Sequence, residues 1–193
     1  MDNIIEIRWH GRGGQGAKTA ALLFADAAMD LGKYIQAFPE YGPERMGAPV
    51  QSFNRLSDDP ITVHCGITSP RVVVVLDPTL MATVNVAQGL PADGNLIVNT
   101  SKTPAEIRKE ISLKLGKVFT VDASAIALEK IGRNIPNTPM LGALVKVSGL
   151  LDFEKMLKNT EAKLNKKFAH KPEIVKGNME AIRAAYDTVR GEK

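Results

Sequence analysis

The segment HGRGGQGAKT, residues 10–19, places four glycines and three basic side chains in ten positions. Glycines let a backbone turn tightly and approach a phosphate, and a helix that follows such a turn offers free N–H groups and a partial positive charge. Arg12 and Lys18 add charge of the right sign for an anion. We therefore predict an anion-binding loop here, in preference to a tight turn without a ligand. Its residues are Gly11, Arg12, Gly13, Gly14, Gln15 and Gly16.

Two known kinds of phosphate loop match this segment only in part. Gly11, Gly13 and Gly16 fit the G-x-G-x-x-G pattern of a dinucleotide site, which also needs an acid at the end of the second strand. Glu40 is suitably spaced but enters a Pro/Gly-rich loop instead of a repeated strand–helix unit. A nucleotide P-loop is disfavoured because Ala17 separates the last glycine from the lysine and would turn that lysine about 100° around the helix.

Residues for bond chemistry or metal binding are scarce. His10, His64 and His170 have no metal-ligand spacing, and the chain contains no G-x-S-x-G nucleophile motif. Cys65 is the single cysteine, which suits a reducing compartment, and one thiol does not supply the four ligands of an iron–sulfur cluster. We predict no catalytic residue and no metal site in this chain.

Composition indicates a globular protein. The chain has 193 residues, 44% of them hydrophobic and 24% charged, which suits a single domain over residues 1–193. A net charge of +4 is too mild, and 5% aromatics too few, to favour nucleic acid as a partner. The first residues do not resemble a signal peptide, and no apolar run has the length of a membrane helix. We expect a cytoplasmic protein that does not bind membranes.

Apolar patterning predicts alternating strands and helices around the glycine loop. Strands are expected at 4–9, 34–39, 71–77, 94–100 and 117–124, and a β-hairpin at 50–64 with its turn at 57–60. Helices are expected at 17–32, 78–90, 103–116, 124–132 and 138–150, followed by two amphipathic helices within 150–193.

This alternation is typical of an α/β fold. We predict a three-layer α/β/α domain with a mostly parallel, Rossmann-like sheet, into which the hairpin is inserted. The run of four valines within residues 71–77 has the character of a central strand that is covered on both faces. The helical C-terminal extension, residues 150–193, is expected to pack on the same core, in preference to forming a separate docking arm.

Three motifs in this order resemble one known family. GRGGQG at 11–16, FPEYGPERMGAPV at 38–50 and NTPMLGAL at 137–144 are similar to segments of the gamma subunit of pyruvate:ferredoxin oxidoreductase (pyruvate synthase). More broadly, they resemble the gamma components of 2-oxoacid:ferredoxin oxidoreductases. The resemblance covers nearly the whole chain.

The resemblance implies a place in a larger enzyme, a heterotetramer with alpha, beta and delta subunits. Such a complex converts a 2-oxoacid and coenzyme A to acyl-CoA and CO2, and passes the electrons to ferredoxin. Thiamine diphosphate with Mg and the [4Fe-4S] clusters would belong to the partner subunits. The gamma component would lack a complete active site and would assist coenzyme A binding and assembly.

The resemblance also extends the candidate site. It implies that the loop from Gly11 to Gly16 cradles a phosphate of coenzyme A and that Arg45, next to Glu44, supplies a charged contact. Without the resemblance, Glu44 and Arg45 would be interpreted as a solvated pair in a turn. Two alternatives stay open: a stand-alone NAD(P)-dependent dehydrogenase, suggested by the glycine pattern with Glu40, and a phosphate-binding regulatory module.

Overall fold

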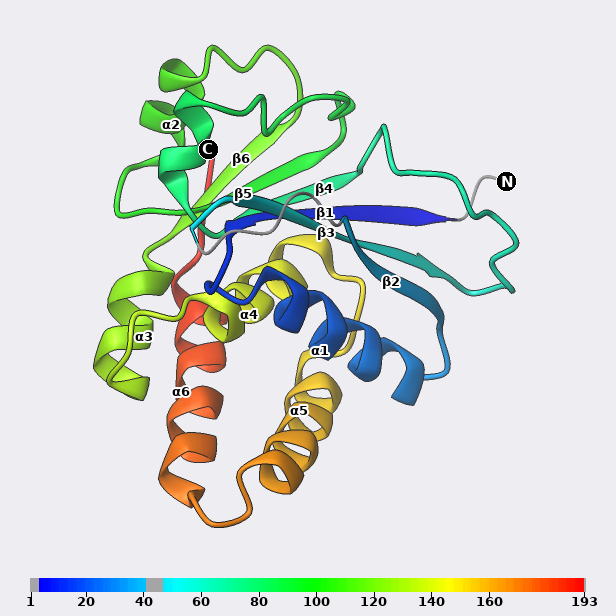
Figure 1. The fold of residues 1–193 in the computed structure, drawn as a ribbon. Coiled ribbons are helices and arrows are strands. Elements are labelled where there is room, and N and C mark those ends of the chain that lie inside the picture. Colours follow the sequence, from blue (N-terminus) through cyan, green and yellow to red (C-terminus); the bar gives the residue numbers. More distant parts are fainter. Residues whose placement is uncertain (1–3, 41–46, 193) are drawn as a thin grey trace.

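The computed structural model describes residues 4–40 and 47–192, which form one seven-stranded sheet with helices on both faces (Figure 1). The strands are β1 (Ile5–Arg12), β2 (Tyr34–Glu40), β3 (Pro49–Ser57), β4 (Val72–Val75), β5 (Asn95–Asn99), β6 (Lys117–Val121) and β7 (Arg190–Gly191). The helices are α1 (Ala17–Asp30), the 3-10 helix η1 (Pro78–Ala82), α2 (Pro104–Glu110), α3 (Ala123–Ile131), α4 (Asn137–Ser148), α5 (Phe153–Lys167) and α6 (Pro172–Thr188).

The sheet has a parallel centre and antiparallel edges. Its strand order is β2-β3-β1-β4-β5-β6-β7, and β1, β4, β5 and β6 run parallel. At one edge β3 lies between β2 and β1, antiparallel to both, and at the other edge β7 is antiparallel to β6. The four valines of β4 are buried, as expected for a strand covered on both faces.

The helices are divided unequally between the two faces, which confirms the three-layer α/β/α architecture but makes one layer thin. Figure 1 shows α1, α3, α4, α5 and α6 on one side of the sheet and α2 on the other. The larger core joins Trp9 of β1 to apolar residues of α1, α4, α5 and α6. The smaller core joins Val73 and Val75 to η1, α2 and the coil that follows η1. Helices therefore cover only the β4–β6 half of this second face.

The hairpin forms with a different partner from the one predicted. The first half of segment 50–64 is strand β3, but its second half carries no strand, and β3 pairs instead with β2 and β1. The reason lies in Arg55, whose Nη1 donates to the Val63 carbonyl oxygen at 3.4 Å and whose Nη2 donates to that of Cys65 at 2.5 Å. A buried side chain therefore holds this coil where a second strand was expected.

The helix predicted at 78–90 is also shorter than expected. Only Pro78–Ala82 is helical, as a 3-10 turn capped by the Asp77 side chain, which accepts from the Thr79 N–H at 2.9 Å. Farther along, the carbonyls of Val86 and Gln88 accept hydrogen bonds from Arg8. Those carbonyl oxygens therefore bond to a side chain of β1, where a helix would have bonded them to its own N–H groups.

The C-terminal helices pack on the large core. Met156 of α5 and Ile182 of α6 are fully buried in it. Gly142 allows α4 and α6 to approach closely, because a Cβ at this position would lie 2.1 Å from the Ile182 carbonyl oxygen. Among the described residues, none of the helices combines the length and apolarity that a membrane crossing requires.

Candidate functional site

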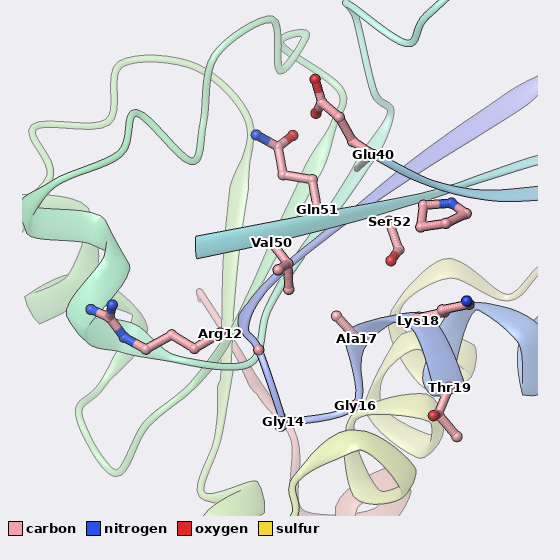
Figure 2. Close-up of a pocket in the computed structure, with 12 residues that line it drawn as sticks. Arg12, Gly14, Gly16, Ala17, Lys18, Thr19, Glu40, Val50, Gln51 and Ser52 are labelled. Carbon is pink, nitrogen blue, oxygen red and sulfur yellow. The ribbon is translucent and has the colours of Figure 1, made fainter. Parts of the chain in front are cut away.

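A cavity of about 510 Å³ opens where the glycine loop enters α1 (Figure 2). Three parts of the chain form its walls: the loop, the first turn of α1, and the facing ends of β2 and β3. The lining residues are Arg12, Gly13, Gly14, Gly16, Ala17, Lys18, Thr19, Pro39, Glu40, Val50, Gln51 and Ser52. The anion-binding segment predicted from the sequence thus lies at a cavity.

Three of the four loop glycines occupy positions where a side chain would be strained or crowded. Gly14 and Gly16 have φ of 98° and 84°, a left-handed backbone that favours glycine. A Cβ on Gly16 would also lie 2.5 Å from Nδ2 of Asn137, the first residue of α4. Gly11 is buried against Leu76, where a Cβ would lie 3.2 Å from Cδ1. The loop is therefore both turned by its glycines and packed closely against β4 and α4.

Several loop amides are already satisfied within the protein. The Arg12 N–H donates to Gln15 Oε1 at 2.8 Å, and the Gly13 N–H donates to the Ala48 carbonyl at 2.9 Å. The Gln15 N–H donates to the Arg12 carbonyl at 3.0 Å. In contrast, α1 begins at Gly16 without a side-chain cap, and the first turn of a helix has no intrahelical acceptors for its N–H groups. The groups best placed for an anion are thus at the start of α1.

Arg12 points away from the cavity interior. Figure 2 shows its side chain extending away from α1. Its Nε donates to Asp77 Oδ2 at 3.1 Å, Nη2 to Thr79 Oγ1 at 2.9 Å and Nη1 to the Gly47 carbonyl at 3.1 Å. In this structure Arg12 therefore joins the loop to η1 and to the chain that leads into β3, and its charge is shared with Asp77.

Asp77, between β4 and η1, is a second polar centre next to the glycine loop. Besides Arg12 and Thr79, its carboxylate accepts from Gln15 Nε2 at 2.8 Å. Burial raises the pKa of Asp77, but the hydrogen bonds from Thr79 and Gln15 and the charge of Arg12 outweigh it and bring this pKa below its usual value. Asp77 is therefore a stable anion that holds the glycine loop from the β4 side.

The side chains of β2 and β3 divide between the two faces of the sheet. In Figure 2, Val50 and Ser52 project toward α1, whereas Glu40 and Gln51 project away from it. Glu40 therefore lies at the cavity edge. In a dinucleotide site the second strand adjoins the first in parallel. Here β3 separates β2 from β1, so the geometry does not favour that alternative.

The three sequence motifs meet at the glycine loop, and the first two of them line the cavity. Asn137 of the third motif packs against Gly16 of the first. Residues at the end of the second motif reach the loop through the Gly13 bond to Ala48 and a bond from the Gly47 N–H to the Gly13 carbonyl at 3.3 Å. The predicted contacts Glu44 and Arg45 lie outside the described residues. Within the described part of the chain, no group of three His, Cys, Asp or Glu residues is arranged for a metal ion.

Comparisons with known proteins identify relatives that share this whole fold. The family model for pyruvate ferredoxin/flavodoxin oxidoreductase matches residues 6–188. The chain is 49% identical to pyruvate synthase subunit PorC of Thermotoga maritima over 185 residues, 96% of this chain and 94% of that protein. It is 47% identical to the pyruvate/ketoisovalerate oxidoreductases common subunit gamma of Thermococcus litoralis, over 95% and 96% of the two chains. The crystal structure of the Thermotoga maritima subunit matches with a TM-score of 0.87 and 45% identity over 100% of both chains.

Proposed function

The chain belongs to the pyruvate ferredoxin/flavodoxin oxidoreductase family, and we propose that it assists coenzyme A binding in a complex that converts a 2-oxoacid to acyl-CoA. The resemblance of its motifs to gamma subunits is confirmed by relatives named as gamma and PorC subunits. The chain is thus one component of a multisubunit oxidoreductase. In this proposal pyruvate or a related 2-oxoacid reacts with coenzyme A, and ferredoxin accepts the electrons.

The redox and decarboxylation chemistry is assigned to alpha, beta and delta subunits. Thiamine diphosphate with Mg and the [4Fe-4S] clusters would be bound there. The single Cys65 supports this division, because a cluster of that kind needs several thiolate ligands and this chain supplies one. Assembly with those subunits would then bring the cavity at α1 to the reacting groups.

One observation carries the coenzyme A proposal: α1 starts without a side-chain cap at the mouth of a cavity that residues of the first two motifs line, and Asn137 of the third motif packs against Gly16. Coenzyme A carries a pyrophosphate, and a helix N-terminus with free N–H groups suits such a group. Lys18 and Thr19 of the first turn line the same cavity. Arg12 and Gln15 act on the ligand indirectly, because they brace the loop through Asp77.

A pair of glycine variants tests this role. Gly14 and Gly32 both have positive φ, of 98° and 79°, and a Cβ at either position meets no atom within 4 Å. Substitution by alanine at either position should therefore lower the unfolding free energy by about 1 kcal/mol, because the backbone is strained. Only Gly14 lines the cavity, whereas Gly32 follows the far end of α1. We expect Gly14→Ala to weaken coenzyme A binding about fivefold or more and Gly32→Ala to leave it unchanged.

Titration calorimetry with the full chain, and with the assembled complex, measures this effect. Coenzyme A and NAD(H) are compared as ligands for the parent protein and both variants. Coenzyme A binding that both variants weaken equally would place the ligand elsewhere. Tight NAD(H) binding without a response to coenzyme A would replace the proposal with the dehydrogenase alternative.

A further inference from the structure

A buried arginine lies in the sheet, on the face opposite α1. Arg8, in β1, keeps only 6% of its surface accessible. Its Nε donates to His10 Nε2 at 3.0 Å, and its Nη2 donates to the carbonyl oxygens of Val86 and Gln88 at 2.9 and 2.6 Å. Burial and the Arg8 charge lower the pKa of His10 to about 4, so the imidazole is neutral at pH 7. All three acceptors of Arg8 are therefore uncharged.

Arg8 differs in this respect from the neighbouring buried arginine. Arg55, on the same face, forms an ion pair with Glu6 at 2.8 Å. No acid in the described part of the chain forms such a pair with Arg8, and Glu40 acts on it only through its charge at longer range. Burying a cation without a counter-charge is costly, and hydrogen bonds to neutral groups compensate it only in part. This arrangement favours an anion supplied from outside the described chain.

A second cavity gives such an anion access to Arg8. It has a volume of about 460 Å³ and is lined by Arg8 and His10, by Phe38 and Phe53, and by the coil after η1. The two phenylalanine rings are stacked, with centroids 5.4 Å apart, and offer an apolar wall. The Gln51 side chain, which projects away from α1 in Figure 2, also lines it. The lining thus combines one buried charge with apolar and amide groups, as small-molecule sites usually do, and the exposed carboxylate of Glu40 lies at its rim.

We propose that this cavity binds a small organic anion, with a carboxylate or phosphate group of the ligand on the Arg8 guanidinium. Arginine suits this task because its planar fork binds such groups with two hydrogen bonds. The inference does not rest on the coenzyme A proposal, because the cavity lies on the other face of the sheet. The two cavities nevertheless share Pro39, Glu40 and Gln51 at their rims. The anion is therefore either a separate metabolite or the far end of a ligand seated at α1.

Binding is tested with inorganic phosphate and pyruvate as probes. The full chain is labelled with 15N, and the imidazole nitrogens of His10 are followed by NMR, because His10 Nε2 accepts directly from Arg8. We expect a saturable shift of the His10 signals with at least one probe. Arg8→Met, which removes the charge and keeps a long side chain, should weaken the response about tenfold or more. Absence of a saturable shift with both probes in the parent protein would overturn the proposal.

A second variant keeps the test valid if Arg8→Met does not fold. Glu40 is exposed at the end of β2 and repels an anion in this cavity, so Glu40→Gln should tighten probe binding about two- to fivefold at low salt. Glu161→Gln, on the exposed side of α5, is the matched control and should change nothing. Equal affinity of the parent and Glu40→Gln proteins would contradict an anion at this position.

Competition identifies the source of the anion. If saturating coenzyme A displaces the probe, the cavity holds part of that ligand, and if both bind together it holds a separate metabolite. The measurement is repeated on the assembled complex. A probe that binds the free chain but not the complex would show that a partner's carboxylate occupies Arg8, and the small-molecule site would be rejected.

Discussion

At the scale of single residues, neutral His10 is held inside a positively charged environment. The imidazole is buried, and its Nε2 accepts from the charged Arg8, so the proton of the neutral ring resides on Nδ1. Protonation would bury a second positive charge next to the first. The same arrangement that places the Arg8 charge against the imidazole therefore makes His10 sensitive to acid.

We predict that His10 makes the protein less stable in mild acid. Its pKa is about 4 in the folded protein, whereas the ordinary value of 6.5 applies to the unfolded chain, so the unfolded chain binds more protons between these two pH values. The unfolding free energy should accordingly fall as the pH drops from 6.5 to 4, by roughly 3 kcal/mol from this group. Urea unfolding measured across that interval checks the slope.

Two glutamine variants separate His10 from the other groups. His10→Gln retains an acceptor for Arg8 and should flatten the pH dependence between pH 4 and 6.5. His64→Gln changes an exposed histidine and should leave the slope as it is in the parent protein. If both variants keep the parent slope, the acid sensitivity does not arise from His10.

At the scale of elements, close contacts through glycine position the site. Gly16 at the start of α1 packs on Asn137 at the start of α4, and Gly142 brings α4 against α6. Asn137 Oδ1 also accepts a hydrogen bond from the Thr138 N–H. The Thr138 hydroxyl donates in turn to Asn178 Oδ1 of α6 at 2.7 Å. The helix that carries the third motif is thus held from both sides, and it in turn supports the glycine loop.

We predict that Gly142→Ala destabilises the protein although alanine is the better helix former. Helix propensity alone would stabilise α4 by about 1 kcal/mol. However, the new Cβ would lie 2.1 Å from the Ile182 carbonyl oxygen, so α6 must move away. Overpacking of this kind typically costs about 1–3 kcal/mol, enough to reverse the sign. Urea unfolding gives the net change in unfolding free energy.

Gly149→Ala is the matched comparison for this variant. Gly149 follows α4 with φ of 63°, and a Cβ there meets no atom within 4 Å. Its cost should be about 1 kcal/mol from the left-handed backbone alone. A Gly142→Ala protein as stable as the parent would show that α6 shifts without loss of packing.

At the scale of the whole molecule, the chain's C-terminal end closes the sheet next to α2. Strand β7 pairs with β6. The Glu192 carboxylate accepts hydrogen bonds from Nε and Nη2 of Arg108 in α2, the second at 2.6 Å. Glu192 also accepts from the Val118 N–H at 3.0 Å. The hydrogen bond from Arg108 is the main reason that the pKa of Glu192 lies below its usual value. The last residues therefore contribute to the fold although they follow the last helix.

We predict that truncation after Thr188 lowers the unfolding free energy by about 1–3 kcal/mol, because it removes β7 and the Glu192 carboxylate that accepts from Arg108 and from the Val118 N–H. Glu192→Gln keeps the strand and removes only the charge, so it should lose about half as much. Urea unfolding at pH 7 compares the two with the full chain. A truncated protein that unfolds at the parent's urea concentration would refute a structural role for this segment.

Local signals predicted many elements of this fold. The valine run of β4 and the amphipathic patterns of α5 and α6 each act over a few neighbouring residues, and the structure confirms them. The segment after β3 was predicted wrongly because its conformation depends on side-chain hydrogen bonds from Arg55, which the apolar pattern does not report. The coil after η1 likewise depends on Arg8, and no local pattern reveals either contact.

By itself the sequence determined the α/β class, the glycine loop before α1 and, through three ordered motifs, the family. Only the tertiary structure decided that β3 separates β2 from β1, that Arg12 turns to Asp77, and that Arg8 is buried against His10. The physical reason is the distance along the sequence over which each interaction acts. Backbone propensities and apolar periodicity are set by near neighbours, whereas ion pairing and burial are decided by residues that only the folded chain brings together.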